Sequence, residues 1–322
     1  MITEPNYDKV GADIKATFDL IKRKASERIF ESTDELNEFL SQFRHEINNT
    51  VKIDFLGLSP TQMANILHVP FRPDNAIFQL QEVDKESLEK IPIVASSLYF
   101  LNKLNTEDIK ASQLGNLPRD FVRELYDKFF SKETYSFVPH KEDDSQQISS
   151  LRRILTVAGL IKLKSKKFSL TEKGRTVLHN GDYNILFKEL FTAFANKFNW
   201  GYGDRYPDFA LIQSSCIFNI YMLHKKAQEW TDEKILGDLY VRAFPALKRE
   251  CEIAYWEPEQ EISNCFRVRF LERFCLPLGL IEEKPEGEKL ERTVFYRITP
   301  VFRMLFKFSI RKPDKTKATA TG

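Results

Sequence analysis

The sequence predicts a mainly α protein with a minor α+β component, in which short β-hairpins follow groups of helices. Apolar residues recur at three- and four-residue spacing over much of the chain, as amphipathic helices require. Two stretches, 151–178 and 271–306, share one order of elements: a helix ending in Gly-Leu-Ile, a charged hairpin, a strand closing on Thr and a second helix. A helical trio followed by a hairpin, or wing, is typical of winged-helix variants of the helix-turn-helix. The repeat therefore predicts two winged-helix-like domains in tandem.

The length of 322 residues exceeds what one hydrophobic core usually holds, so several domains are expected. We predict an N-terminal helical region at 1–90, winged-helix-like domain 1 at 91–200, winged-helix-like domain 2 at 201–310 and a disordered basic tail at 311–322. The formal net charge is only +2, so binding to nucleic acid requires a local basic patch. No run of about 18 apolar residues occurs, which argues against a membrane span.

Three helices are expected in the N-terminal region. The first is marked by Ile14, Phe18, Ile21, Ala25 and Ile29. The second begins at Ser32-Thr33-Asp34-Glu35. Its buried stripe is expected to comprise Leu36, Phe39, Leu40, Phe43 and Ile47. Ser59 as N-cap and Pro60 at the first helical position begin the third helix. The stretch 74–90 is expected to be a connecting segment.

Each repeat is expected to contain the same elements in the same order. In the first repeat, apolar helices at 93–104 and 121–129 precede a helix capped by Ser145, and a hairpin then turns at 164–166. Gly279 follows Gly159 by 120 residues, whereas Thr299 follows Thr171 by 128, so the second hairpin is eight residues longer. The same order could also arise by chance, because helices followed by a hairpin are common. The sequence leaves open whether the two repeats share an origin.

The first repeat carries a strongly basic patch. Between Leu151 and Leu178, eight Lys and Arg residues stand against the single acid Glu172, which is a local net charge of +7. Lysines in a wing turn are suited to contact phosphate, and the preceding helix is the one that enters the major groove. The nucleic-acid-binding residues that we predict are Arg152, Arg153, Lys162, Lys164, Lys166 and Lys167, with Arg267, Arg269 and Arg273 in the second repeat.

Acidic residues oppose this interpretation. Glu142-Asp143-Asp144 stands just before the third helix of the first repeat, where acids favour the helix dipole but repel phosphate. Glu257, Glu259 and Glu261 precede the corresponding helix of the second repeat, whose hairpin carries Glu282, Glu283, Glu286, Glu288 and Glu291. Binding to DNA or RNA and a protein–protein interaction scaffold without nucleic-acid binding are therefore both kept as hypotheses. The oligomeric state is left open, and no membrane partner is expected.

The loop 199–207 is rich in aromatic residues. Trp200, Tyr202 and Tyr206 either stack on a base or ligand, or pin the linker against an adjoining domain. The second use is the more typical of such loops.

No group of residues predicts catalysis. A phosphate-cradling glycine loop is absent, because Gly201-Tyr202-Gly203 lacks the third glycine and the preceding strand. The five histidines stand singly, and the four cysteines are too widely spaced for a zinc knuckle. We therefore expect no enzymatic activity, no cofactor and no metal. The cysteine usage and the polar N-terminus predict a cytoplasmic protein.

Several short motifs, in order over most of the chain, resemble an uncharacterised group of bacterial proteins. They are Phe55-Leu56-Gly57-Leu58-Ser59-Pro60-Thr61-Gln62-Met63, Gly115-Asn116-Leu117-Pro118, Phe121-Val122-Arg123-Glu124-Leu125, Ala158-Gly159-Leu160 and Leu170-Thr171-Glu172-Lys173-Gly174. Some members of that group are associated with SEC-C zinc knuckles or plasmid-borne passenger proteins. The resemblance implies a bacterial cytoplasmic setting and brings no established activity. The SEC-C cysteine cluster has no counterpart here, so zinc is not implied.

Overall fold

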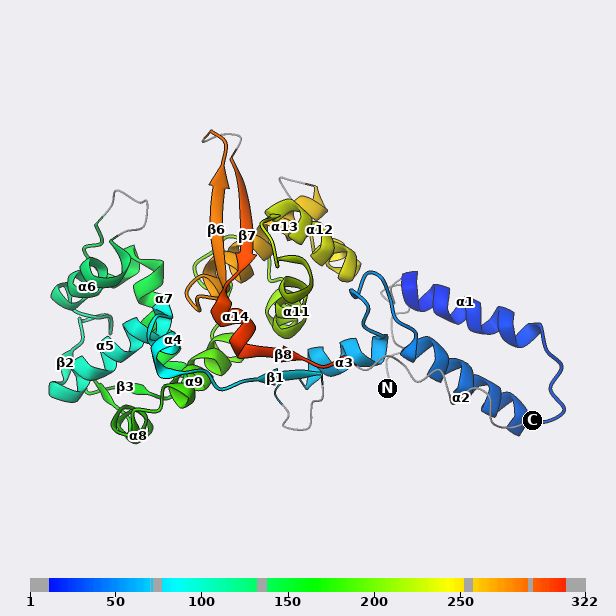
Figure 1. Ribbon diagram of the computed structural model, residues 1–322, viewed down its shortest axis with the longest axis horizontal. Helices are drawn as coiled ribbons and strands as arrows, with labels where there is room; N and C mark the ends of the chain where they lie inside the picture. Colours follow the sequence, from blue (N-terminus) through cyan, green and yellow to red (C-terminus); the bar gives the residue numbers. More distant parts are fainter. Residues whose placement is uncertain are drawn as a thin grey trace.

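The computed structural model describes residues 12–69, 71, 77–131, 138–251, 257–288 and 292–310, with side chains from residue 18 onward. Over this part the chain is mainly helical with small sheets, as predicted (Figure 1). The basic tail predicted at 311–322 lies outside the described residues.

The N-terminal helices form a hairpin that extends from one end of the molecule (Figure 1). Helix α1 spans Ala12–Ser26 and α2 spans Thr33–Asn49, with the Ser32 hydroxyl accepting a hydrogen bond from Glu35 N. The apolar stripe predicted on α2 has the expected periodicity, but the structure shows it half-buried, and α2 has no buried residue. The expectation of burial was wrong because, among the described elements, α2 packs mainly on α1 and α3 and lies outside the main body.

Helix α3, Pro60–His68, connects this arm to the main body. A capping box at Ser59 and Gln62 begins the helix, which buries Met63 and Ile66. The segment before α3 is held to the body as well, since the Tyr221 hydroxyl donates to the Leu56 carbonyl at 2.9 Å.

The segment after α3 is more ordered than predicted. Instead of a simple connection, it contains strand β1, Phe78–Leu80, and helix α4, Lys85–Glu89. Strand β1 pairs antiparallel with β8, Phe306–Phe308, so Phe78 lies opposite Phe308. No local pattern could show this pairing, because the partner strand lies at the other end of the chain.

The first unit contains the elements of the first repeat in the predicted order. Its helices are α5 (Pro92–Thr106), α6 (Arg119–Leu125, continued by a π-helical turn at Tyr126–Phe130), α7 (Gln146–Val157), α8 (Glu172–Asn180) and α9 (Tyr183–Asn196), with a 3-10 turn at Glu142–Asp144. Its strands are β2 (Ile109–Lys110), β3 (Ile161–Lys164) and β4 (Lys167–Leu170). They form an antiparallel sheet in the order β2-β4-β3.

The second unit repeats this arrangement. Its helices are α10 (Ala210–Ser214), α11 (Cys216–Lys226), α12 (Glu233–Ala243), α13 (Pro258–Phe266, continued by a π-helical segment at Arg267–Cys275) and α14 (Pro300–Leu305), with a 3-10 turn at Pro245–Glu250. Its strands β5 (Thr231–Asp232), β6 (Ile281–Glu286) and β7 (Thr293–Ile298) form a sheet in the order β5-β7-β6. The longer β6–β7 hairpin projects from the body (Figure 1).

Each unit contains the same hydrogen bond, made by an equivalent threonine. The Thr171 hydroxyl donates to the Gly159 carbonyl at 2.6 Å, and the Thr299 hydroxyl donates to the Gly279 carbonyl at 2.7 Å. Each threonine is also the N-cap of the helix that follows its hairpin. Both glycines have positive φ, of 73° and 63°, which explains why glycine ends the preceding helix in each unit.

A continuous core joins the units. Phe191 and Phe194 of α9 contact Phe274 of the second unit, with ring centroids 5.9 and 5.0 Å apart. All three side chains are buried. These contacts cross the predicted domain boundary at 200/201. The β1–β8 pair likewise joins the predicted N-terminal region, 1–90, to the predicted second domain, 201–310. The domain boundaries therefore stay predictions.

The turn of the first hairpin offers a test of backbone conformation. Ser165 and Lys166 have φ of 50° and 58°, the left-handed conformation that Asn and Gly tolerate best in two-residue hairpins. Ser165→Asn combined with Lys166→Gly is therefore expected to raise the free energy of unfolding by about 1 kcal/mol, measured by urea denaturation. Ser165→Ala, the matched control, should bring no gain. A loss of stability in the double variant would contradict this turn conformation.

Candidate nucleic-acid interface

Four lysines share the outer face of the first sheet. Lys110 on β2 pairs with Lys167 on β4, and Lys167 pairs with Lys164 on β3. Directly opposed residues of an antiparallel sheet point to the same face, and Lys162 follows at the two-residue period of β3. All four are exposed. We call Lys110, Lys162, Lys164 and Lys167 the lysine face; Lys166, also exposed, stands at the adjoining turn.

The opposite side of this sheet is apolar. Ile109 pairs with Phe168, and Phe168 pairs with Leu163, so these side chains point away from the lysine face. Phe168 is 1% exposed and Ile109 is 7% exposed. Leu163 is 44% exposed, so the apolar side is buried at Ile109 and Phe168 but open to solvent near the hairpin turn. Burial of Ile109 and Phe168 on one side of the sheet places the lysines on the other side, at the surface.

The lysine face has no internal counterion in the described residues. The ion pairs of the first unit involve Lys103, Arg123, Arg152 and Lys173 instead. Like charges placed opposite each other in a sheet destabilise it, so this arrangement costs the fold free energy. It also leaves several closely spaced donors available for one polyanion.

Sequence reasoning missed Lys110. It lies about 50 residues before the hairpin, which begins at Ile161, and its strand has only two residues, too few for an alternating pattern to be detected. Its place beside Lys167 comes from the antiparallel pairing of β2 with β4, a tertiary contact.

The arginines of α7, in contrast, are engaged inside the protein. Arg152 Nε donates to Glu142 Oε1 at 2.6 Å, and the Arg152 side chain is only 11% exposed. Arg153 Nη2 donates to the Tyr202 hydroxyl at 2.6 Å, and its guanidinium lies 4.0 Å from the centre of the Tyr202 ring. Both predicted contacts of α7 with nucleic acid would therefore require these interactions to break.

The acidic run before α7 is also largely used within the fold. Glu142 is fully buried and accepts a hydrogen bond from Leu117 N at 2.7 Å in addition to the one from Arg152. Asp144 accepts from the backbone N–H groups of His140 and Lys141. Of the three acids, Asp143 is the exposed one. The expected repulsion of phosphate at this helix start is correspondingly weaker than the sequence suggested.

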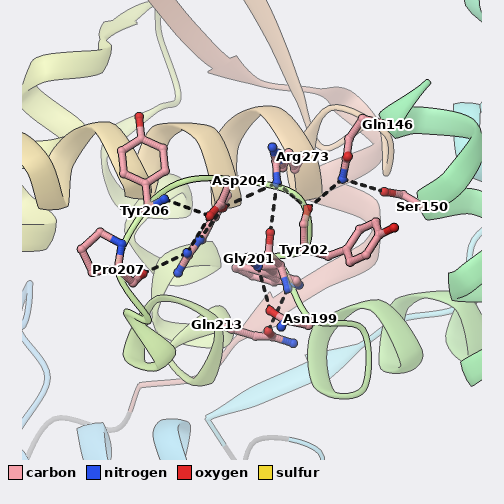
Figure 2. Close-up of polar contacts among 12 residues, drawn as sticks. Gln146, Ser150, Asn199, Gly201, Tyr202, Asp204, Tyr206, Pro207, Gln213 and Arg273 are labelled. Carbon is pink, nitrogen blue, oxygen red and sulfur yellow. Dashed lines mark hydrogen bonds and ion pairs between the residues drawn. The ribbon is translucent and has the colours of Figure 1, made fainter. Parts of the chain in front are cut away.

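The arginines predicted in the second unit are paired with acids. Arg269 donates to both carboxylate oxygens of Asp204, from Nε at 2.8 Å and from Nη2 at 3.0 Å, and each side chain is 5% exposed. Burial acts to lower the pKa of Arg269, but the hydrogen bonds to Asp204 raise it above its ordinary value. Arg273 Nη1 lies 3.5 Å from the same carboxylate (Figure 2). The prediction that Arg269 contacts nucleic acid is corrected, because the side chain is buried in this pair.

Arg267 lies among acids at the base of the second hairpin. It pairs with Glu272 and lies 3.4 Å from Glu233. Burial raises the pKa of Glu233 and of Glu283 nearby. Arg267 is therefore balanced by acids of its own unit, and a continuous positive face joining it to Lys164 and Lys167 is interrupted, which favours the scaffold hypothesis at this hairpin.

The aromatic loop pins the two units together. Trp200 is 1% exposed, its indole N–H donates to the Phe194 carbonyl at 2.8 Å, and its ring contacts Phe274. The Tyr202 carbonyl accepts from Gln146 on α7 and from Arg273 of the second unit, both at 3.1 Å (Figure 2). Tyr206 is half-buried, and burial raises its pKa. Trp200 therefore has no free ring face for a base, and the loop serves as a linker clamp.

Other chemistry finds little support in the residues described by the structure. No group of three His, Cys, Asp or Glu side chains in these residues could hold a metal ion. Cys216, Cys265 and Cys275 are buried free thiols, and burial raises the pKa of Cys265 to about 12. That thiol is consequently protonated, and unreactive as a nucleophile, at neutral pH. Within the described segments, no helix has the length and apolar character to cross a membrane.

Comparison with models of known families, with curated proteins and with solved structures finds no match. The resemblance to an uncharacterised bacterial group therefore stays a prediction, and the function is argued from the site alone.

Proposed function

We propose that the protein binds the phosphate backbone of nucleic acid through the lysine face of the first sheet, and that its two repeated units are winged-helix-like domains. The observation that carries this proposal is the row Lys110-Lys167-Lys164 across three strands, exposed and without internal counterions in the described chain. Such a row offers several cations to the regularly spaced charges of a nucleic acid. In this arrangement the β3–β4 hairpin is the wing.

The contacts favour backbone binding over base reading. Arg152 and Arg153, which α7 would need for bidentate recognition of guanine, are held by Glu142 and Tyr202. Lysines on a sheet face supply point charges, which position a protein on phosphate without selecting a sequence. The binding is accordingly expected to depend on salt and only weakly on the nucleotide sequence. Duplex DNA is the first ligand to test.

Changing Lys110, Lys164 and Lys167 together to Gln is expected to weaken binding to a labelled DNA duplex at least about tenfold at low salt. Each lysine that contacts a phosphate contributes about 0.9 to the slope of log K against log salt, so the slope should fall by about 3. Fluorescence polarisation over a salt series measures both quantities. Single-stranded DNA and double-stranded RNA, tested in parallel, identify the preferred polymer.

The matched control changes three exposed lysines on other elements, Lys197, Lys234 and Lys307, to Gln. Net charge falls equally, but binding should change little. The lysine-face variant should also be slightly more stable in urea, by about 0.2–1 kcal/mol, because opposed like charges are removed. Unfolding then cannot account for lost binding. Equal weakening by both variants, or no retention of any probe at low salt, would refute the proposal.

A protein–protein interaction scaffold stays the second candidate. It is favoured by two exposed aliphatic side chains beside a pocket, Ile53 at 92% and Val51 at 47% exposed.

A further inference from the structure

A pocket of about 410 Å³ lies where the N-terminal arm meets the second unit. One wall is the segment 51–57, between α2 and α3, and the other is formed by residues near the ends of α11 and α12. Its apolar lining comes from Val51, Ile53, Leu56 and Leu239. The volume falls within the range of sites that bind small molecules or a few residues of a peptide.

The segment that forms the first wall is held in a closed turn. Lys52 N donates to the Leu58 carbonyl at 2.9 Å, and Gly57 N donates to the Lys52 carbonyl at 3.0 Å. Leu56 has a φ of 55°, a left-handed conformation that is unfavourable for a bulky residue. The turn therefore holds Ile53 out in solvent at a conformational cost. An aliphatic side chain displayed in this way marks a contact surface more than a folding contact.

The rim of the pocket is strongly basic. Lys52, Lys225, Lys226 and Arg242 line it and are exposed, whereas Asp54 is the single acid of the lining. None of these four cations takes part in an ion pair with any residue that the structure describes. Three of these cations, Lys225, Lys226 and Arg242, also stabilise α11 and α12, because they lie near the negative C-terminal ends of the helix dipoles. Lys52 lies in the turn, so the helix dipoles do not explain its position.

We propose that this pocket binds an acidic peptide segment of a partner protein, which inserts one aliphatic side chain against Val51, Ile53, Leu56 and Leu239. Four cations from three separate segments exceed what a single carboxylate or phosphate head group engages, and instead suit a partner with several carboxylates. The aliphatic lining supplies the anchor site that gives such a peptide its affinity.

This site is separate from the lysine face. Strand β3 lies at one end of the molecule, whereas α11 and α12 lie near its middle, on the side that faces the N-terminal arm (Figure 1). The proposal goes beyond nucleic-acid binding, and each function can fail without the other. Variants of the pocket should leave DNA binding unchanged, and the lysine-face variant should leave peptide binding unchanged.

The test uses the full chain and the labelled peptide Ac-Glu-Glu-Asp-Leu-Glu-Asp-Glu, followed by fluorescence polarisation. Saturable binding is expected, and the same peptide with Ser in place of Leu should bind about tenfold more weakly, because the buried aliphatic contact is lost. Ile53→Ser should weaken binding of the parent peptide, while Ile29→Ser should not. Ile29 is the matched control because it is 96% exposed and lies away from the pocket.

Reversal of charge at the rim of the pocket provides a second experiment. Lys226→Glu with Arg242→Glu should weaken peptide binding about tenfold or more at low salt, whereas Lys234→Glu with Lys197→Glu should have little effect. Equal binding of the Leu and Ser peptides would overturn the proposal, since charge alone would then account for it. Octanoate binding without peptide binding would also overturn it and identify the site as one for small amphiphiles. Failure of the parent peptide to bind at low salt would overturn it as well.

Discussion

Replacement of Asp204 by Ala is expected to lower the free energy of unfolding by about 3–5 kcal/mol, the usual cost of leaving a buried charge without its partner. Asp204 accepts two hydrogen bonds from Arg269, whose side chain is only 5% exposed, and lies 3.5 Å from Arg273. Without the carboxylate, Arg269 keeps the Pro207 carbonyl, 3.0 Å from Nη2, as its remaining acceptor. Urea denaturation followed by circular dichroism measures the loss.

Asp208→Ala is the matched control for this experiment. Asp208 lies in the same stretch of chain, is exposed and has no ion pair in the described structure, so its replacement should change stability by less than about 0.5 kcal/mol. A second comparison is Asp204→Ala in a background that carries Arg269→Met. Because the buried charge is then absent, the loss on removing Asp204 should shrink by 1 kcal/mol or more, about the coupling expected for contacting residues. Additive losses would show that the pair is not coupled as the structure indicates.

The position of Asp204 explains why this effect should be large. The loop that carries it also contains Trp200, buried against Phe274, and Tyr202, which contacts Arg153. Loss of the Asp204–Arg269 pair should therefore loosen the junction of both units at once. Two-state unfolding is expected for the natural sequence because a continuous core joins them, as the contacts of Phe191 and Phe194 with Phe274 show.

Local signals predicted much of the fold. Ser32, Ser59 and Ser145 each cap the helix expected to begin there, because an N-cap hydrogen bond depends on residues only a few positions away. Likewise, Thr171 and Thr299 occupy matching caps after their hairpins. The order of elements in each repeat could be predicted because hairpins and caps are encoded over short distances.

Features that depend on distant contacts could not be predicted in this way. Strand β1 pairs with β8 from the far end of the chain, and Lys110 reaches the lysine face only through pairing with β4. The burial expected for the stripe of α2 failed for the same reason. Its periodicity is a property of the helix, but its burial depends on what packs against it.

The local net charge of +7 overstates the number of cations that are free to bind a ligand. Arg152 is paired with Glu142, and Lys173 lies 2.5 Å from Glu189, so two of the counted cations are balanced by acids outside the counted stretch. The cations left on the sheet are lysines, which suit contacts with phosphate in water, whereas planar guanidinium groups were used for buried and stacked contacts. A count of charges along the sequence cannot separate these two uses.

Glu142→Ala should show how far the lysine face depends on the buried pair beneath it. The substitution leaves Arg152, 11% exposed, without its carboxylate and removes the acceptor of Leu117 N. A loss of about 3–5 kcal/mol in the free energy of unfolding is expected. Because the Arg152 guanidinium lies 5.8 Å from the Phe168 ring, amide hydrogen exchange in β4 should also accelerate.

The neighbouring acid provides the control. Asp143→Ala removes an exposed carboxylate one residue away, which accepts from the Asn116 side chain at 3.0 Å, and should cost no more than about 1 kcal/mol. Removal of Asp143 also takes one negative charge from the surface near α7, so DNA binding should strengthen slightly. Glu142→Gln keeps an acceptor but loses the charge, so its cost should lie between the two. If Glu142→Ala lowered the free energy of unfolding no more than Asp143→Ala, Glu142 would have to be exposed to solvent. The acidic run 142–144 would then be expected to repel phosphate.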